Sequence, residues 1–196
     1  MTADEIVKEI TRRAWSFGVA VLLAPAESVK NGNIRSGGWF DGDSAQPVLA
    51  TAASGDPSSW IGTLLHEYCH LTQWAEGAPI WKGADGWGKV GPWLDGKQVR
   101  GVEAAIADVR ELEADCERRT VRLIREMNAP VDLDEYIRAA NSYVHFYNVM
   151  AETRKWYAEG RGPYSVPEVL AAANPTLDAD FRKTPAKLRK LLLTCV

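Results

Sequence analysis

Two histidines and a glutamate at close spacing are the residues of this sequence best suited to chemistry. The stretch HEYCH carries His66, Glu67 and His70. On a helix, residues four apart share one face, so both imidazoles could bind one zinc ion from the same side. The carboxylate of Glu67 lies beside them and suits a base that acts on water at the metal. The alternative is an ordinary solvated helix, but two of the chain's three histidines fall at ligand spacing.

A catalytic zinc site usually takes three protein ligands, so a third must come from elsewhere in the chain. The segment ELEAD carries Glu111 and Asp115 four residues apart, again on one helical face. We expect Glu111 to bind the ion and Asp115 to accept a hydrogen bond from the free ring nitrogen of a ligand histidine. Glu113 is the alternative ligand, because periodicity turns it toward apolar residues, where a carboxylate needs a partner.

Further candidates lie among the aromatic segments. His145 is a candidate donor to the oxyanion that forms when an amide is attacked, and the alternative, which the aromatic residues around it favour, is an amphipathic packing helix. Cys69 and Cys116 are interpreted as packing residues of two helices. Aromatic side chains with a polar group suit recognition surfaces, and four are candidate substrate-binding residues: Trp81, Trp87, Trp93 and Tyr164.

The elements that must position these residues follow from periodicity and turn residues. Residues 1–56 are predicted to form a helix (3–16) and a small sheet, with strands near 19–26, 33–40 and 47–52. Residues 57–77 are predicted to form the helix that carries the histidines. Asp56 can cap that helix, and Pro57 fits its first position.

The second half of the chain is predicted to be mostly helical. Residues 78–97 are rich in glycine and tryptophan and are expected to form a long irregular loop. Residues 98–196 are expected to contain two long helices, near 98–127 and 132–158, and two shorter ones. No internal repeat interrupts this order, so we expect a single domain over 1–196.

Composition excludes several classes of function. The chain has 196 residues and a net charge of -3, which does not favour binding to nucleic acid or to an anionic membrane. No stretch approaches the roughly 20 apolar residues of a membrane span. Its three cysteines are far apart and form no paired motif, which is typical of a reducing compartment, so a cytoplasmic location is expected.

The two motifs together resemble those of the gluzincin metallopeptidases, H-E-x-x-H on one helix and E-x-x-x-D on a later one. ELEAD is also similar to the glutamate helix of the ImmA/IrrE-type intracellular metallopeptidases. The resemblance implies an α+β, zincin-like fold in which a small N-terminal sheet packs on the active-site helix. It also implies that an edge strand, here 47–52, holds an extended peptide.

The expected function is therefore zinc-dependent hydrolysis of amide bonds in a polypeptide substrate. His66, His70 and Glu111 would hold one Zn²⁺, and Glu67 would take a proton from the attacking water. Two alternatives stay open. One is a catalytically silent zinc protein that regulates or assembles with a protein partner, and the other is an amidase that acts on small molecules. The sequence gives no indication of the oligomeric state.

Overall fold

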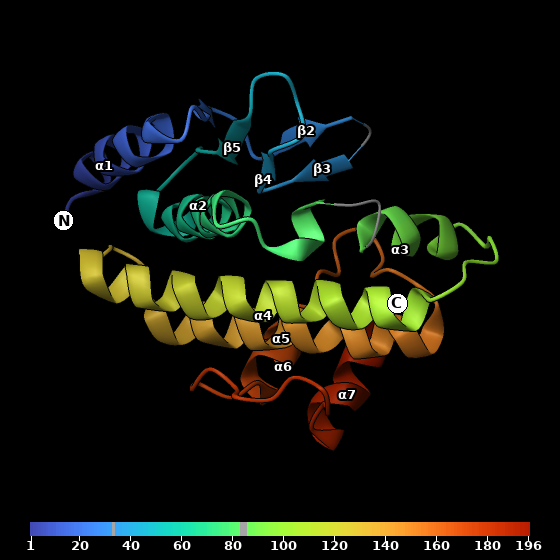
Figure 1. The fold of residues 1–196 in the computed structure, drawn as a ribbon. Coiled ribbons are helices and arrows are strands. Elements are labelled where there is room, and N and C mark those ends of the chain that lie inside the picture. Colours follow the sequence, from blue (N-terminus) through green and yellow to red (C-terminus); the bar gives the residue numbers. More distant parts are fainter. Residues whose placement is uncertain (33, 83–85) are drawn as a thin grey trace. The chain divides into compact units, whose positions relative to one another are not determined.

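The computed structural model describes residues 1–32, 34–82 and 86–196 (Figure 1). The contacts between residues fall into two compact units. Unit 1 comprises Met1–Trp81 and Cys116–Asp132, and unit 2 comprises Lys82–Asp115 and Leu133–Val196. The long helix α4 (Val102–Met127) contributes to both. The predicted α+β class, with a small sheet and a mostly helical second half, is confirmed.

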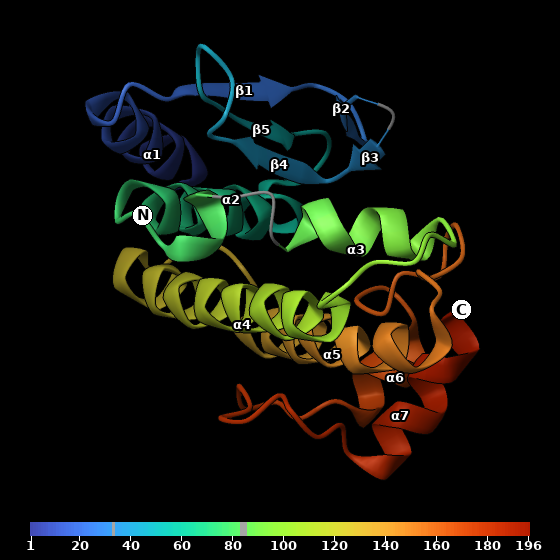
Figure 2. The ribbon, with the colours of Figure 1, turned by 45° about the vertical axis from the view of Figure 1, so that its right-hand side comes forward.

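The sheet of unit 1 has three strands in the order β1-β5-β4 (Figure 2). Strand β5 (Val48–Ala52) pairs in parallel with β1 (Ala20–Ala24) and antiparallel with β4 (Gly38–Asp41). The prediction that 47–52 is an edge strand is therefore wrong. Four of the five β5 residues are buried, and a short run of small and apolar residues such as VLATA is typical of a central strand covered on both faces. The edges are β1 and β4.

A separate two-stranded ribbon lies between β1 and β4 in the sequence. Its strands, β2 (Val29–Asn31) and β3 (Ile34–Ser36), pair antiparallel. Val29 is buried and packs with residues of β5, so the ribbon contributes to the same apolar cluster as the sheet.

Two helices pack on the sheet. Helix α1 (Ala3–Ser16) begins at a capping box formed by Thr2 and Glu5, as the Thr-x-x-Glu pattern favours, and it contacts β1. Helix α2 (Ile61–Ala75) contacts β4 and β5. Before it, the side chain of Asp56 accepts a hydrogen bond from the backbone of Ser58, within the short 3-10 turn η1 (Pro57–Ser59). The predicted cap and helix are thus confirmed, with the α-helical part beginning at residue 61.

The stretch predicted to be an irregular loop contains two helical segments, the 3-10 turn η2 (Pro79–Lys82) and helix α3 (Trp87–Leu94). That prediction is therefore wrong for 87–94. Glycine and Pro92 disfavour a helix locally, but Val90 is fully buried and Trp87 packs against aromatic rings of unit 2. Tertiary packing outweighs the weak propensity of this segment. Residues 83–85 of the predicted loop lie outside the described part of the chain.

The remaining helices of unit 2 pack on one another. Helix α5 (Leu133–Thr153) contacts both α6 (Pro167–Ala172) and α7 (Ala186–Leu192), and the 3-10 turn η3 (Leu193–Cys195) follows. Phe181 and Leu177, from the connection between α6 and α7, pack against Ala114 of α4 and Val144 of α5. Within the described residues, every helix is too short or too polar to cross a bilayer.

Candidate metal centre

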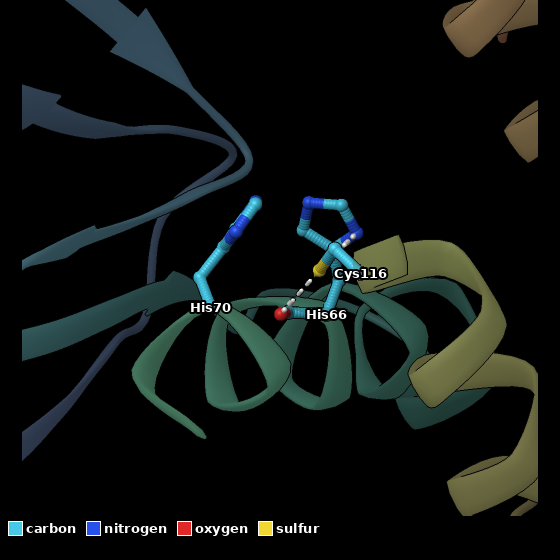
Figure 3. Close-up of side chains that lie close together, drawn as sticks. All are labelled: His66, His70 and Cys116. Atoms are coloured by element: carbon cyan, nitrogen blue, oxygen red, sulfur yellow. Dashed lines mark hydrogen bonds between the residues drawn. The ribbon is translucent and has the colours of Figure 1, made fainter. Parts of the chain in front are cut away.

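Helix α2 places the two motif histidines side by side. The ring centroids of His66 and His70 are 4.6 Å apart, and the rings meet edge to face (Figure 3). His70 and Glu67 are each 7% exposed, and the apolar residues around them on α2 are buried as well. The histidines therefore do not lie on a solvated surface helix, which was the alternative interpretation of this motif.

A third donor of unit 1 lies with the histidines. The ligand atoms of His66, His70 and Cys116 all lie within 4.8 Å of one another, and these residues could hold a metal ion. Cys116 is on α4, and its sulfur is 3.6 Å from Nδ1 of His66 (Figure 3). The thiol also donates to the backbone carbonyl of His66 at 3.3 Å. The sequence predicted Cys116 as a packing residue, and it is fully buried, but its position beside His66 was not foreseen.

Each of the two motif histidines also has an oxygen partner at Nδ1. Oε1 of Glu117, a buried residue of α4, lies 3.2 Å from Nδ1 of His66. Oε1 of Gln73 lies 2.9 Å from Nδ1 of His70, three residues earlier on the same helix. Partners of this kind orient metal-binding imidazoles in many sites.

Charge around the site shifts the pKa values of nearby groups. Burial by itself lowers the pKa of His66, but electrostatic interactions and hydrogen bonds with Cys116 and Glu117 outweigh burial, so the pKa lies well above its ordinary value. Burial raises the pKa of the Cys69 thiol to about 12. Cys69 therefore stays protonated at neutral pH, which agrees with its interpretation as a packing residue rather than a ligand.

Glu67 is held between α2 and the edge strand β4. A Cβ atom added to Gly38 would lie 2.8 Å from Cγ of Glu67 and 2.7 Å from Cγ2 of Thr63. Only a residue without a side chain leaves room for Glu67 at this point. The predicted base is therefore positioned by the strand at the sheet edge as well as by its own helix.

Of the four aromatics predicted to bind substrate, Trp81 lies beside a site histidine. Its ring meets His70 edge to face at 5.7 Å and Phe40 of β4 at 5.6 Å. The other three belong to unit 2. Trp87 packs on Tyr147 and Trp156, Trp93 stacks under Arg154, and Tyr164 pairs with Tyr157 through their hydroxyl groups. Their roles in substrate binding stay predictions.

The carboxylates of the second motif differ in their surroundings. The side chain of Glu111 is 52% exposed and pairs with Arg110 at 3.2 Å. Glu113 is 6% exposed, and the hydroxyl of Tyr147 donates to its Oε1 at 3.5 Å. Glu111, Glu113 and Asp115 all belong to unit 2. The roles expected for Glu111 as ligand and Asp115 as orienting acceptor stay predictions, while Glu117 and Gln73 face the histidines within unit 1.

His145 is a buried residue of unit 2. Its Nε2 lies 2.9 Å from Asp178, and its ring packs on Phe181 with 4.9 Å between centroids. Burial lowers its pKa, although the Asp178 carboxylate beside it acts in the opposite direction. These contacts explain the residue as part of the packing of α5, and its expected role as an oxyanion donor stays a prediction.

Two residues beside the site histidines, Glu117 and Gln73, were not predicted from the sequence. The signal for Glu117 is its helical spacing from two other polar residues, Glu113 and Thr120, and all three are buried on α4. Buried polar residues on one helical face need partners on a neighbouring element. Gln73 follows His70 by three residues, the spacing at which helical side chains meet.

Comparison with known protein families, with curated proteins and with solved structures gave no match for this chain. The resemblance to gluzincins therefore depends on the two motifs alone.

Proposed function

We propose that this chain is a zinc-dependent hydrolase of amide bonds that acts on a polypeptide. The observation that carries the proposal is the cluster of donor atoms of His66, His70 and Cys116, which could hold a metal ion, with the buried residue Glu67 next to His66 on the same helix. Imidazole together with thiolate or carboxylate is a donor set that zinc accepts. When bound, zinc would lower the pKa of a water molecule and polarise the substrate carbonyl.

Glu67 would move the protons of the reaction. Its carboxylate accepts a proton from the attacking water and passes it to the nitrogen of the leaving amine. Burial keeps the carboxylate away from bulk water, and the contact with Gly38 fixes its stem, so its reach toward a bound substrate is defined.

For the third protein ligand, burial favours Glu113. It is 6% exposed, as expected for a charge that faces an ion rather than water. Glu111 precedes Glu113 by two residues and so projects from nearly the opposite side of the helix, where it is exposed.

For the substrate, we assign the role of docking strand to β4. It is an edge of the sheet, and an extended peptide can add to such an edge through backbone hydrogen bonds. Because Gly38 of β4 touches the stem of Glu67, a peptide paired with β4 would run past the proposed base.

The test is a cleavage assay on unfolded polypeptides and small amides with the zinc-loaded protein. Glu67→Gln should keep zinc but lose roughly 10²–10⁴-fold in turnover, the usual contribution of a general base. Glu103→Gln, at an exposed position of α4, is the matched control and should be unaffected. A Glu67→Gln variant as fast as the parent would overturn the assignment. Bound zinc without any cleavage that depends on Glu67 would instead favour a regulatory or assembly protein.

A further inference from the structure

We propose that Glu117 and Gln73 are positioning residues that hold both site histidines with the proton on Nδ1 and the lone pair on Nε2. The inference rests on the proposed metal site and specifies which nitrogen of each ring faces the ion. A neutral imidazole has one donor and one acceptor nitrogen, and the hydrogen bond made by one decides the state of the other.

The first ring is determined by a carboxylate. Oε1 of Glu117 lies 3.2 Å from Nδ1 of His66, and both residues are largely enclosed, with side chains 6% and 16% exposed. An ionised carboxylate only accepts hydrogen bonds, so Nδ1 of His66 must be the donor. The lone pair of this ring is then left on Nε2.

The second ring is determined by an amide. Oε1 of Gln73 lies 2.9 Å from Nδ1 of His70, and Gln73 is 1% exposed. The carbonyl oxygen of the amide accepts a hydrogen bond from the N–H group at Nδ1. This again leaves the lone pair on Nε2. Because His70 and Gln73 are three residues apart on α2, the backbone of the helix itself sets this contact.

The position of Cys116 becomes clear from the same geometry. Two neighbouring donors of one tetrahedral zinc ion lie roughly 3.5 Å apart, and the sulfur lies 3.6 Å from Nδ1 of His66, so these two atoms could share an ion. A proton on Nδ1 excludes that pairing. The thiol of Cys116 instead donates to the carbonyl of His66 and holds that turn of α2 against α4. The two arrangements exclude each other.

His145 provides an internal contrast. Its Nε2 faces the carboxylate of Asp178 at 2.9 Å, and its Nδ1 is buried without a hydrogen-bond partner among the described residues. The same reasoning puts its proton on Nε2, the opposite of the two site histidines. The chain has three histidines, so each ring can be assigned separately.

Long-range ¹H–¹⁵N correlation spectra of the full chain, with and without zinc, read these states directly. In the zinc-loaded protein we expect a protonated Nδ1 and a zinc-shifted Nε2 for His66 and His70, with His145 protonated on Nε2 and unchanged by zinc. Zinc on Nδ1 of either site ring, or a proton on its Nε2, would overturn the inference. If the parent bound no zinc, the proposed function would fail. The spectrum of the zinc-free protein would still show which nitrogen of each ring carries a proton, and would so support or overturn the inference.

Matched variants test the positioning itself. Glu117→Leu and Gln73→Leu remove the acceptor, and each should weaken zinc binding about 10–100-fold, the usual effect of losing such a partner. Glu117→Gln and Gln73→Glu keep an oxygen at the same position, so these variants should bind zinc nearly as tightly as the parent. In the cobalt-substituted parent, a thiolate-to-metal absorption band together with an unprotonated Nδ1 of His66 would also overturn the inference. Unchanged zinc affinity in both leucine variants would do the same.

Discussion

At the scale of single residues, a carboxylate can serve as a ligand only if its charge is turned toward the ion rather than toward water. Glu113 meets this condition better than Glu111, because Glu113 is buried whereas the side chain of Glu111 is half exposed. The buried hydroxyl groups beside it belong to Tyr143 and Tyr147, and burial and the charge of Glu113 raise their pKa values well above the ordinary value. Both tyrosines therefore remain hydrogen-bond donors.

The two glutamates make a matched pair for a first prediction. Glu113→Gln should weaken zinc binding by more than the roughly 10–100-fold that follows from losing an outer partner, because a ligand is lost. Glu111→Gln should leave zinc affinity nearly unchanged, since its exposed ion pair with Arg110 contributes little. Titration of the zinc-free proteins with zinc measures both. The reverse order of effects would restore Glu111 as the third ligand.

How much of the site could be predicted varies from residue to residue. His66, Glu67 and His70 were predicted because their spacing is set by one helix, and a helix brings such residues together whatever the rest of the fold does. Glu117 could not be placed in the same way. It contacts His66, a residue of another helix that lies 51 positions earlier in the chain. Such a contact depends on how α2 and α4 pack, which residue types alone do not determine.

At the scale of elements, the close contact between β4 and α2 is the main constraint on the proposed base. The contact needs Gly38, because a methyl group there would also lie 3.1 Å from the carbonyl oxygen of Ala50 in the neighbouring strand. The strand cannot move away without straining its ladder with β5. A side chain at position 38 must therefore displace Thr63 and Glu67.

The second prediction compares two neighbouring glycines. Gly38→Ala should destabilise the fold by about 1–3 kcal/mol, as overpacking does, and should reduce turnover by moving Glu67. In Gly37→Ala the new methyl group would lie 3.8 Å from its nearest neighbour, an ordinary contact. It should change stability by less than about 0.5 kcal/mol. Thermal unfolding and the cleavage assay measure both variants. Equal behaviour of the two would mean that the contact at Gly38 has no functional role.

The elements themselves were predicted with uneven success. Helix α1 matches its predicted bounds, and α2 was expected because its cap and apolar period agree. Helix α3 was missed because it forms against its packing partners rather than from its own sequence. The order of the strands was missed as well, since strand signals in a sequence do not say which strand lies in the middle of the sheet.

At the scale of the whole molecule, unit 2 contains a feature that the sequence did not reveal. A polar stripe on α5 holds the irregular segment between α6 and α7: Arg138, Asn141, His145 and Asn148 each bond to residues of 173–184. The residues of the stripe are three or four positions apart, so they share one helical face. The sequence alone indicates solvated polar side chains at these positions, because their hydrogen-bond partners are far away in the chain.

His145 in this stripe gives a prediction about pH. Its pKa is lowered by burial, opposed by Asp178 and Asp180 and assisted by Arg110. The unfolded chain therefore takes up the proton first as the pH falls. The stabilising contribution is complete above the ordinary pKa of about 6.5 and is lost as the pH falls through the lower pKa of the folded state.

The free energy of unfolding should accordingly decrease on acidification more steeply for the parent than for His145→Gln. The glutamine can still donate to Asp178, so the variant removes the titration and keeps a hydrogen bond. The difference in slope should stay below about 1.4 kcal/mol per pH unit, the limit for one proton. Urea unfolding between about pH 7.5 and 5 measures it. Parallel profiles for the two proteins would show that His145 does not titrate in this range.

The most direct test of the account is the zinc content of purified chains, measured by elemental analysis after loading and gel filtration. The account predicts one zinc ion per chain in the parent, in Glu67→Gln and in His145→Gln, and none in His66→Ala or His70→Ala. A parent chain free of zinc, or an ion that remains when either site histidine is removed, would contradict it.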